Sequence, residues 1–169
     1  MRIFKEQQRF TQLWLIILVA ISTLVPLGIV LGTYYKDSKS MSIIELVSII
    51  SVVILAAGII FLFKLTSRID EKGIHYKFFP FHWTNKSIVW GDINKAYVRS
   101  YSPIGEYGGW GLRGGKLFSK ANGKAINVSE DIGIQLELKN GKKLLIGTQK
   151  KHEAESVLNT YKLKINTNG

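Results

Sequence analysis

The sequence predicts an N-terminal two-helix transmembrane hairpin, followed by a mostly antiparallel β domain of about seven strands that is capped by a C-terminal helix. Three observations lead to this fold class. Two long apolar runs occupy the first third of the chain, the pattern then changes to the alternation of half-buried strands, and the last segment has helical spacing. The predicted boundaries are 1–64 for the hairpin and 65–169 for the β domain.

The two apolar runs predict membrane spans at about 13–35 and 43–63. The first run contains no charged residue, and the second contains none after Glu45. Each can cross a hydrocarbon core of roughly 30 Å at about 1.5 Å per residue. The first run is also longer than the apolar region of a cleaved signal peptide, which has about 7–15 residues. The sequence therefore predicts a multi-pass protein of the cell membrane.

Positive charges near the ends of the spans predict its orientation. They precede the first span, lie between the spans and follow the second: Arg2, Lys5 and Arg9; Lys36 and Lys39; Lys64, Arg68 and Lys72. The positive-inside rule then places both termini in the cytoplasm. Gly28 and Gly32 form a GxxxG pair that would let another helix approach closely, although glycine is also simply common in membrane helices.

Beyond Lys64, alternating apolar residues and turn signals predict short strands. The clearest strand is 132–138, which is followed by Asn140-Gly141, a strong hairpin signal, and by a return strand at 142–148. Asn122-Gly123 predicts a second hairpin between 116–120 and 124–129. Further strands are expected at 66–70 and 74–79, the latter ended by Pro80, and between 87 and 102.

The last segment predicts an amphipathic helix at about 149–161. Ala154, Val157, Leu158 and Tyr161 lie at helical spacing, and Thr148 is placed to cap the first turn. Several short antiparallel strands with one helix carrying a single apolar stripe suggest a partly closed barrel or sandwich plugged by that helix.

Several elements resemble those of a known group of proteins. They are Trp90-Gly91-Asp92-Ile93, the glycine-rich segment 107–113, and the hairpin 138–143 followed by Leu145-Ile146-Gly147-Thr148. They are similar to elements of small uncharacterised bacterial two-span membrane proteins whose cytoplasmic domain is pleckstrin-homology-like (PH-like). The resemblance implies a PH-like fold on a membrane tether. It implies no activity and no functional residue.

Charge and composition limit the possible partners. The net charge is +11, and cysteine is absent, which excludes disulfides, thiolate zinc sites and cysteine nucleophiles. A basic domain can attract nucleic acid, acidic proteins or anionic lipid headgroups, or its charge can simply serve solubility. A domain tethered to a bilayer always meets lipid headgroups, whereas nucleic acid is less accessible to it.

The sequence contains no pattern typical of an enzyme. His75, His82 and His152 have no common metal spacing. Gly109, Gly111 and Gly114 satisfy GxGxxG, but no helix is predicted after them, as a dinucleotide site would need. We therefore predict no catalytic residue, no metal site and no cofactor.

The glycine-rich segment 105–115 is the first candidate site, and two interpretations stay open. In one, Gly108, Gly109 and Gly111 are structural, because they allow positive φ where Trp110 covers the core. In the other, exposed amides and aromatic and basic side chains contact a partner or lipid: Tyr107, Trp110 and Arg113.

The aromatic cluster 76–83, beside Lys77 and Lys86, is the second candidate, either as core or as an interfacial contact. The sequence thus predicts a noncatalytic membrane-anchored module that binds a protein partner or anionic lipid headgroups. The alternative is an accessory subunit of a membrane complex assembled through the hairpin.

Overall fold

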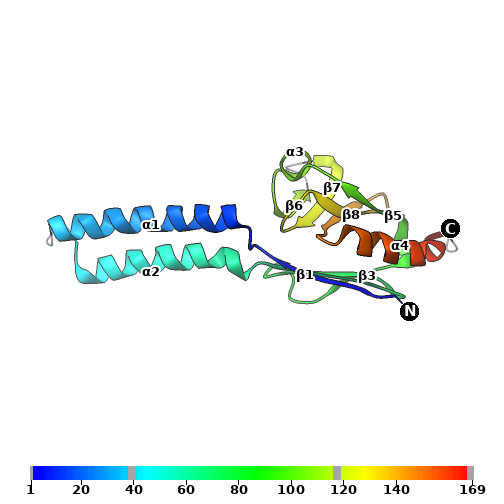
Figure 1. Ribbon diagram of the computed structural model, residues 1–169, viewed down its shortest axis with the longest axis horizontal. Helices are drawn as coiled ribbons and strands as arrows, with labels where there is room; N and C mark the ends of the chain where they lie inside the picture. Colours follow the sequence, from blue (N-terminus) through cyan, green and yellow to red (C-terminus); the bar gives the residue numbers. More distant parts are fainter. Residues whose placement is uncertain (1, 38–40, 116–118, 167–169) are drawn as a thin grey trace. The chain divides into compact units, whose positions relative to one another are not determined.

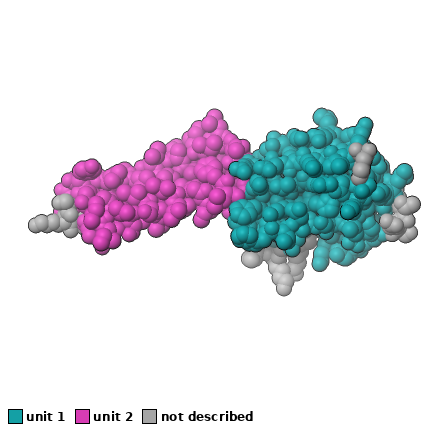
Figure 2. Space-filling model, turned by 90° about the horizontal axis from the view of Figure 1, so that it is seen from below, with its two compact units in different colours: residues 1–9, 64–169 teal, residues 10–63 magenta. Residues whose placement is uncertain are grey.

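The computed structural model describes residues 2–37, 41–115 and 119–166. The chain divides into two compact units (Figure 2). One contains residues 10–63, and the other contains residues 1–9 together with 64–169.

The first unit is a pair of apolar helices. Helix α1 spans Leu13–Lys36, and α2 spans Ile43–Ile59 and continues into a 3₁₀ turn at Ile60–Leu62. Both are long and apolar enough to cross a membrane, and they lie where the sequence predicted spans. A capping box begins α2: the Ser42 amide donates to Glu45 Oε2 (2.7 Å) and the Glu45 amide to Ser42 Oγ (3.3 Å).

The second unit contains two sheets, built from nine strands within the described ranges (Figure 1). Sheet A has the order β1 (Phe4–Arg9), β2 (Lys64–Asp70), β3 (Gly73–Phe79) and β4 (Lys86–Val89). Sheet B has the order β5 (Ile93–Ser100), β8 (Ile132–Leu138), β9 (Lys143–Gly147), β7 (Ser119–Asn127) and β6 (Gly111–Gly115).

The expected partly closed barrel and the count of about seven strands are both corrected by this arrangement. The sheets do not close into a barrel, because no pairing between the described strands joins them, and a 3₁₀ turn at Trp90–Asp92 carries the chain from β4 to β5. Strand β4 pairs with β3, and β5 pairs with β8. The β domain is therefore two mostly antiparallel sheets with a C-terminal helix.

One of the additional strands, β1, precedes the apolar helices. It pairs antiparallel with β2, in register from Phe4 opposite Ile69 to Arg9 opposite Lys64. Phe4, Glu6 and Gln8 are buried, and the side chains between them are exposed. Residues 4–9, which the sequence analysis grouped with the hairpin, thus belong to the β domain, and the helical pair is inserted between its first two strands.

Sheet B differs from the prediction around Asn122-Gly123. The predicted hairpin there is wrong, because β7 runs through both residues and its antiparallel partner is β6. Part of the predicted strand 116–120 lies outside the described residues. Strand β7 also pairs with β9 in parallel. The hairpin at Asn140-Gly141 is confirmed, since β8 and β9 pair antiparallel across it.

The C-terminal helix α4 spans Lys151–Asn166, so it begins and ends later than the predicted 149–161. Its predicted stripe is buried, and Tyr161 stacks on Trp90 with ring centroids 5.2 Å apart. Figure 1 shows α4 between β8 of sheet B and β1 of sheet A. The helix thus contributes its apolar side to the core of the domain.

Buried polar groups connect β1 to the segment before α4. Glu6 Oε2 accepts from the Thr148 hydroxyl (2.7 Å), and Glu6 Oε1 accepts from the Gln149 amide (2.8 Å). Gln8 Nε2 donates to the Gly147 carbonyl (2.9 Å). The predicted capping residue Thr148 therefore precedes the helix, where its hydroxyl donates to Glu6 and accepts from the Lys150 amide (3.1 Å).

Candidate functional site

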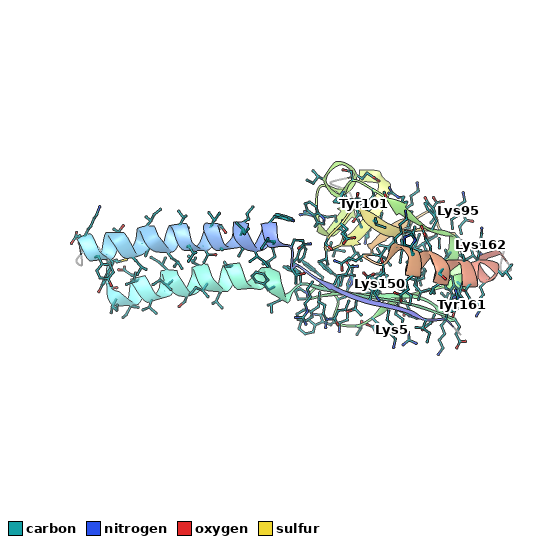
Figure 3. The ribbon with its side chains drawn as sticks, viewed as in Figure 1. Lys5, Lys95, Tyr101, Lys150, Tyr161 and Lys162 are labelled. Carbon is teal, nitrogen blue, oxygen red and sulfur yellow. The ribbon has the colours of Figure 1, made fainter. Side chains whose placement is uncertain are left out.

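The outward face of sheet A carries five basic side chains in cross-strand rows. Residues directly opposite each other project from the same face of a sheet. One row is Arg9, Lys64 and Phe79, the next is Gln7, Thr66 and Lys77, and the third is Lys5, Arg68 and His75. We call Lys5, Arg9, Lys64, Arg68 and Lys77 the basic face. All five are exposed or half-buried, and Figure 3 marks Lys5 on β1.

The register creates two like-charge pairs. Arg9 lies directly opposite Lys64, and Lys5 lies directly opposite Arg68. Like charges at opposed positions destabilise a sheet, by an amount on the order of 0.2–1 kcal/mol per pair. In the described part of the chain, an ion pair within 4.0 Å is found for only one member of the basic face, Arg68. The face is thus suited to an anionic partner that would offset the repulsion.

One end of the face is neutralised by Asp70. Arg68 Nε lies 2.8 Å from Asp70 Oδ2, His75 Nε2 lies 3.1 Å from Asp70 Oδ1, and the Lys72 amide donates to Oδ1. Burial acts to raise the pKa of Asp70, but these hydrogen bonds and the charges of His75 and Arg68 together lower it. An open depression of about 770 Å³ lies here, and Asp70 and Glu71 line it together with Lys5, Arg68 and Lys72. Its charge is mixed.

The unbalanced charge lies at the other end of the sheet, in the row of Arg9, Lys64 and Phe79. This end is also where the chain leaves for the apolar helices. Residue Phe63 alone joins Leu62 to Lys64, and residues 10–12 join Arg9 to Leu13. The segment after Phe79 exposes two aromatic side chains, Phe81 (57%) and Trp83 (77%). Basic and aromatic groups therefore share this end of sheet A.

The structure divides the predicted contact residues between the two sheets. Lys77 belongs to the basic face, and Lys86 is exposed at the start of β4. Trp110 is half-buried and directly precedes β6 of sheet B, and Arg113 is exposed within that strand. Arg113 Nε donates to the Trp110 carbonyl (2.8 Å).

The third residue of that segment, Tyr107, is almost completely buried. It ends the short helix α3 (Pro103–Tyr107), and the following glycines have positive φ: Gly108 (+74°), Gly109 (+121°) and Gly111 (+101°). The Gly108 amide donates to the Ile104 carbonyl and the Gly109 amide to the Pro103 carbonyl. These glycines form the C-terminal cap of α3 and the bend into β6.

Arg99, which the sequence analysis did not single out, fixes α3 to sheet B. Its guanidinium contacts Glu106 through two bonds (2.7 and 3.1 Å), Gln135 Oε1 (3.1 Å) and the Tyr107 hydroxyl (3.3 Å). The hydrogen bond from Arg99 lowers the pKa of Glu106. Burial raises the pKa of nearby Tyr101 to about 12. The network is closed within the domain, so its role is to hold the segment in place.

Replacement of Glu106 by glutamine should change how stability depends on pH. Because the folded-state pKa of Glu106 is lowered, its stabilisation is present above the unfolded pKa and is lost as pH falls through the folded value. We expect Glu106→Gln to cost about 1–2 kcal/mol at pH 7 and less at acid pH. Urea unfolding of the wild-type protein and of the Glu106→Gln variant, at pH 7 and at an acid pH, measures this difference by tryptophan fluorescence. An equal cost at both values would contradict it.

Among the residues that the structure describes, no three His, Asp or Glu side chains are grouped as a metal site would require. The basic face is a feature of the described structure that neither the core nor the turns of the domain explain. Comparison of the chain with protein-family models and with curated proteins finds no match.

Proposed function

We propose that the protein is a noncatalytic, membrane-anchored PH-like module whose basic face binds anionic lipid headgroups on the cytoplasmic side. The observation that carries the proposal is the pairing of Arg9 with Lys64 on an accessible sheet, at the end of the basic face that Asp70 does not neutralise. An unfavourable arrangement of this kind is explained when an external anion is its usual partner.

The helical pair supports the membrane anchor. Large apolar side chains are exposed along both helices, for example Leu24 (67%) and Leu55 (70%). Soluble proteins rarely expose contiguous apolar surface of this extent, whereas acyl chains would cover it. The positive charges that flank the helices favour cytoplasmic termini, and the cytoplasmic leaflet is the anionic one.

Chain length supports contact of Arg9 and Lys64 with the headgroups. Two residue steps separate Leu62 from Lys64, which limits their separation to about 7 Å. A helix that crosses the bilayer and ends at Leu62 would therefore hold Lys64, and Arg9 opposite it, at the level of the headgroups. Each such basic residue contributes on the order of 1 kcal/mol at an anionic surface.

Lipid selectivity of the full chain tests the proposal. Native mass spectrometry of the detergent-solubilised protein, titrated with phosphatidylglycerol or phosphatidylcholine, should show preferential retention of the anionic lipid. We expect Arg9→Gln with Lys64→Gln to reduce that preference about tenfold. The matched control is Lys142→Gln with Lys143→Gln, which removes the same charge from exposed positions at the start of β9 in sheet B. Equal retention of both lipids, or an equal loss in the control, would contradict the proposal.

One observation favours the alternative of an accessory subunit. A Cβ atom built on Gly28, Gly32 or Gly58 would meet nothing within 4 Å, so packing of α1 on α2 does not use these glycines. They leave room for close approach of another membrane helix. In this case Gly28→Leu with Gly32→Leu should remove the membrane proteins that copurify with the wild-type chain. If the same proteins copurify with both, assembly through the hairpin is wrong.

A further inference from the structure

The segment between β3 and β4, residues 80–85, presents large aromatic side chains to solvent. Phe81 is 57% exposed and Trp83 is 77% exposed. We call this segment the aromatic loop. Side chains of this size are usually buried, and two of them exposed in one short segment indicate a contact surface.

The aromatic loop has a defined conformation. Phe81 stacks on Phe78 with ring centroids 5.8 Å apart, and Trp83 contacts Phe79 edge-on, also at 5.8 Å. The His82 amide donates to the Phe78 carbonyl (2.8 Å). Contacts with Phe78 and Phe79 of β3 thus hold the exposed rings in place, so the rings need not reorganise to meet a partner.

The register of sheet A fixes where the aromatic loop begins. Phe79, the last residue of β3, lies opposite Lys64, and opposed Cα atoms of antiparallel strands are about 4.5–5.5 Å apart. Lys64 is two residue steps from Leu62, at the end of the second apolar helix. Adding the two limits keeps Phe79 within about 13 Å of the end of that helix.

We propose that the aromatic loop inserts Phe81 and Trp83 into the headgroup layer of the bilayer that the helical pair crosses. The inference rests on the proposed membrane anchor, but it adds a contact that does not depend on lipid charge. Indole rings favour the membrane–water interface, where the ring meets apolar groups and the N–H meets water or phosphate. Lys86, exposed just after the loop, would then face the phosphates.

The chain contains no cysteine, so a single spin label can be placed without background. We would label Thr84→Cys, next to Trp83, in the full-length protein in phosphatidylcholine nanodiscs, and measure the accessibility of the label to oxygen and to a water-soluble nickel chelate. The matched control is Asn140→Cys, in the exposed turn between β8 and β9. We expect interfacial depth for the first label and full water exposure for the second. Adding Phe81→Ser and Trp83→Ser should move the Thr84 label into water, and tryptophan fluorescence of the core checks that this variant is folded.

A label at Thr84 that is as accessible to the chelate as the control label overturns the proposal. The proposal is also overturned if, in detergent, the Thr84 label becomes protected from the chelate only as the protein concentration rises. A second copy of the chain would then cover the loop. The phosphatidylcholine nanodiscs carry no net charge, so insertion of the loop into them does not depend on anionic lipid. If the loop inserts but mass spectrometry shows no preference for phosphatidylglycerol, only the proposed headgroup binding is contradicted. Anionic preference with the loop in water would contradict only this inference.

Discussion

Replacement of Phe4 by alanine is expected to destabilise the β domain by about 3–5 kcal/mol. The Phe4 side chain is completely buried, although it stands near the N-terminus and before the apolar helices. It lies opposite Ile69, which is itself buried in the core. Truncation would leave a cavity that neither strand can readily fill, because β1 and β2 are held in register along their whole length.

Urea unfolding of the full chain in detergent, followed by tryptophan fluorescence, measures the effect. The matched control is Ile3→Ala, one residue earlier and 43% exposed, for which a loss below about 0.5 kcal/mol is expected. Equal losses for the two variants would show that residues 4–9 are not part of the core.

The position of β1 also determines how the domain should be studied. A fragment that begins at Lys64 lacks the strand that supplies Phe4 and the carboxylate bound to Thr148. It would expose the edge of β2 that pairs with β1. It would also leave the Thr148 hydroxyl and the Gln149 amide without the Glu6 carboxylate that accepts their hydrogen bonds. Binding experiments therefore need the full chain.

The features that could be predicted from the sequence depend on local pattern. Residues 13–36 and 43–62 are apolar over the length of a membrane span, and the alternation in 132–138 with Asn140-Gly141 specifies one hairpin. In both cases the decisive residues are neighbours in the chain. The stripe of α4 is predicted for the same reason.

The features that could not be predicted depend on pairing between distant segments. Strand β1 has polar residues, Glu6 and Gln8, at two of its three inward positions, so it shows no apolar alternation. Its partner follows the whole helical pair. Strand β6, with glycine at three of its five positions, has little intrinsic strand preference. The basic face follows from the register of β1, β2 and β3, so its residues appear in the sequence only as scattered charges.

Replacement of Gly73 by alanine should also cost about 3–5 kcal/mol. Gly73 has φ of +151°, a conformation that residues with a Cβ atom rarely adopt. A Cβ there would overlap the Ile88 carbonyl oxygen and lie 2.9 Å from Val89 Cα, so the backbone of β4 would have to move. Strain and overlap act together at this position.

Gly141→Ala is the matched control for this variant. Gly141 also has positive φ (+77°), but a Cβ there would meet nothing within 4 Å, so only the conformational cost of about 1–2 kcal/mol applies. The difference between the two unfolding free energies reports the close approach of Gly73 to β4 together with the higher conformational cost of its φ of +151°. That approach fixes the register of β3 with β4, and therefore where the aromatic loop begins and ends. Equal costs for the two variants would mean that this register, and the position of Phe81 and Trp83 that follows from it, is wrong.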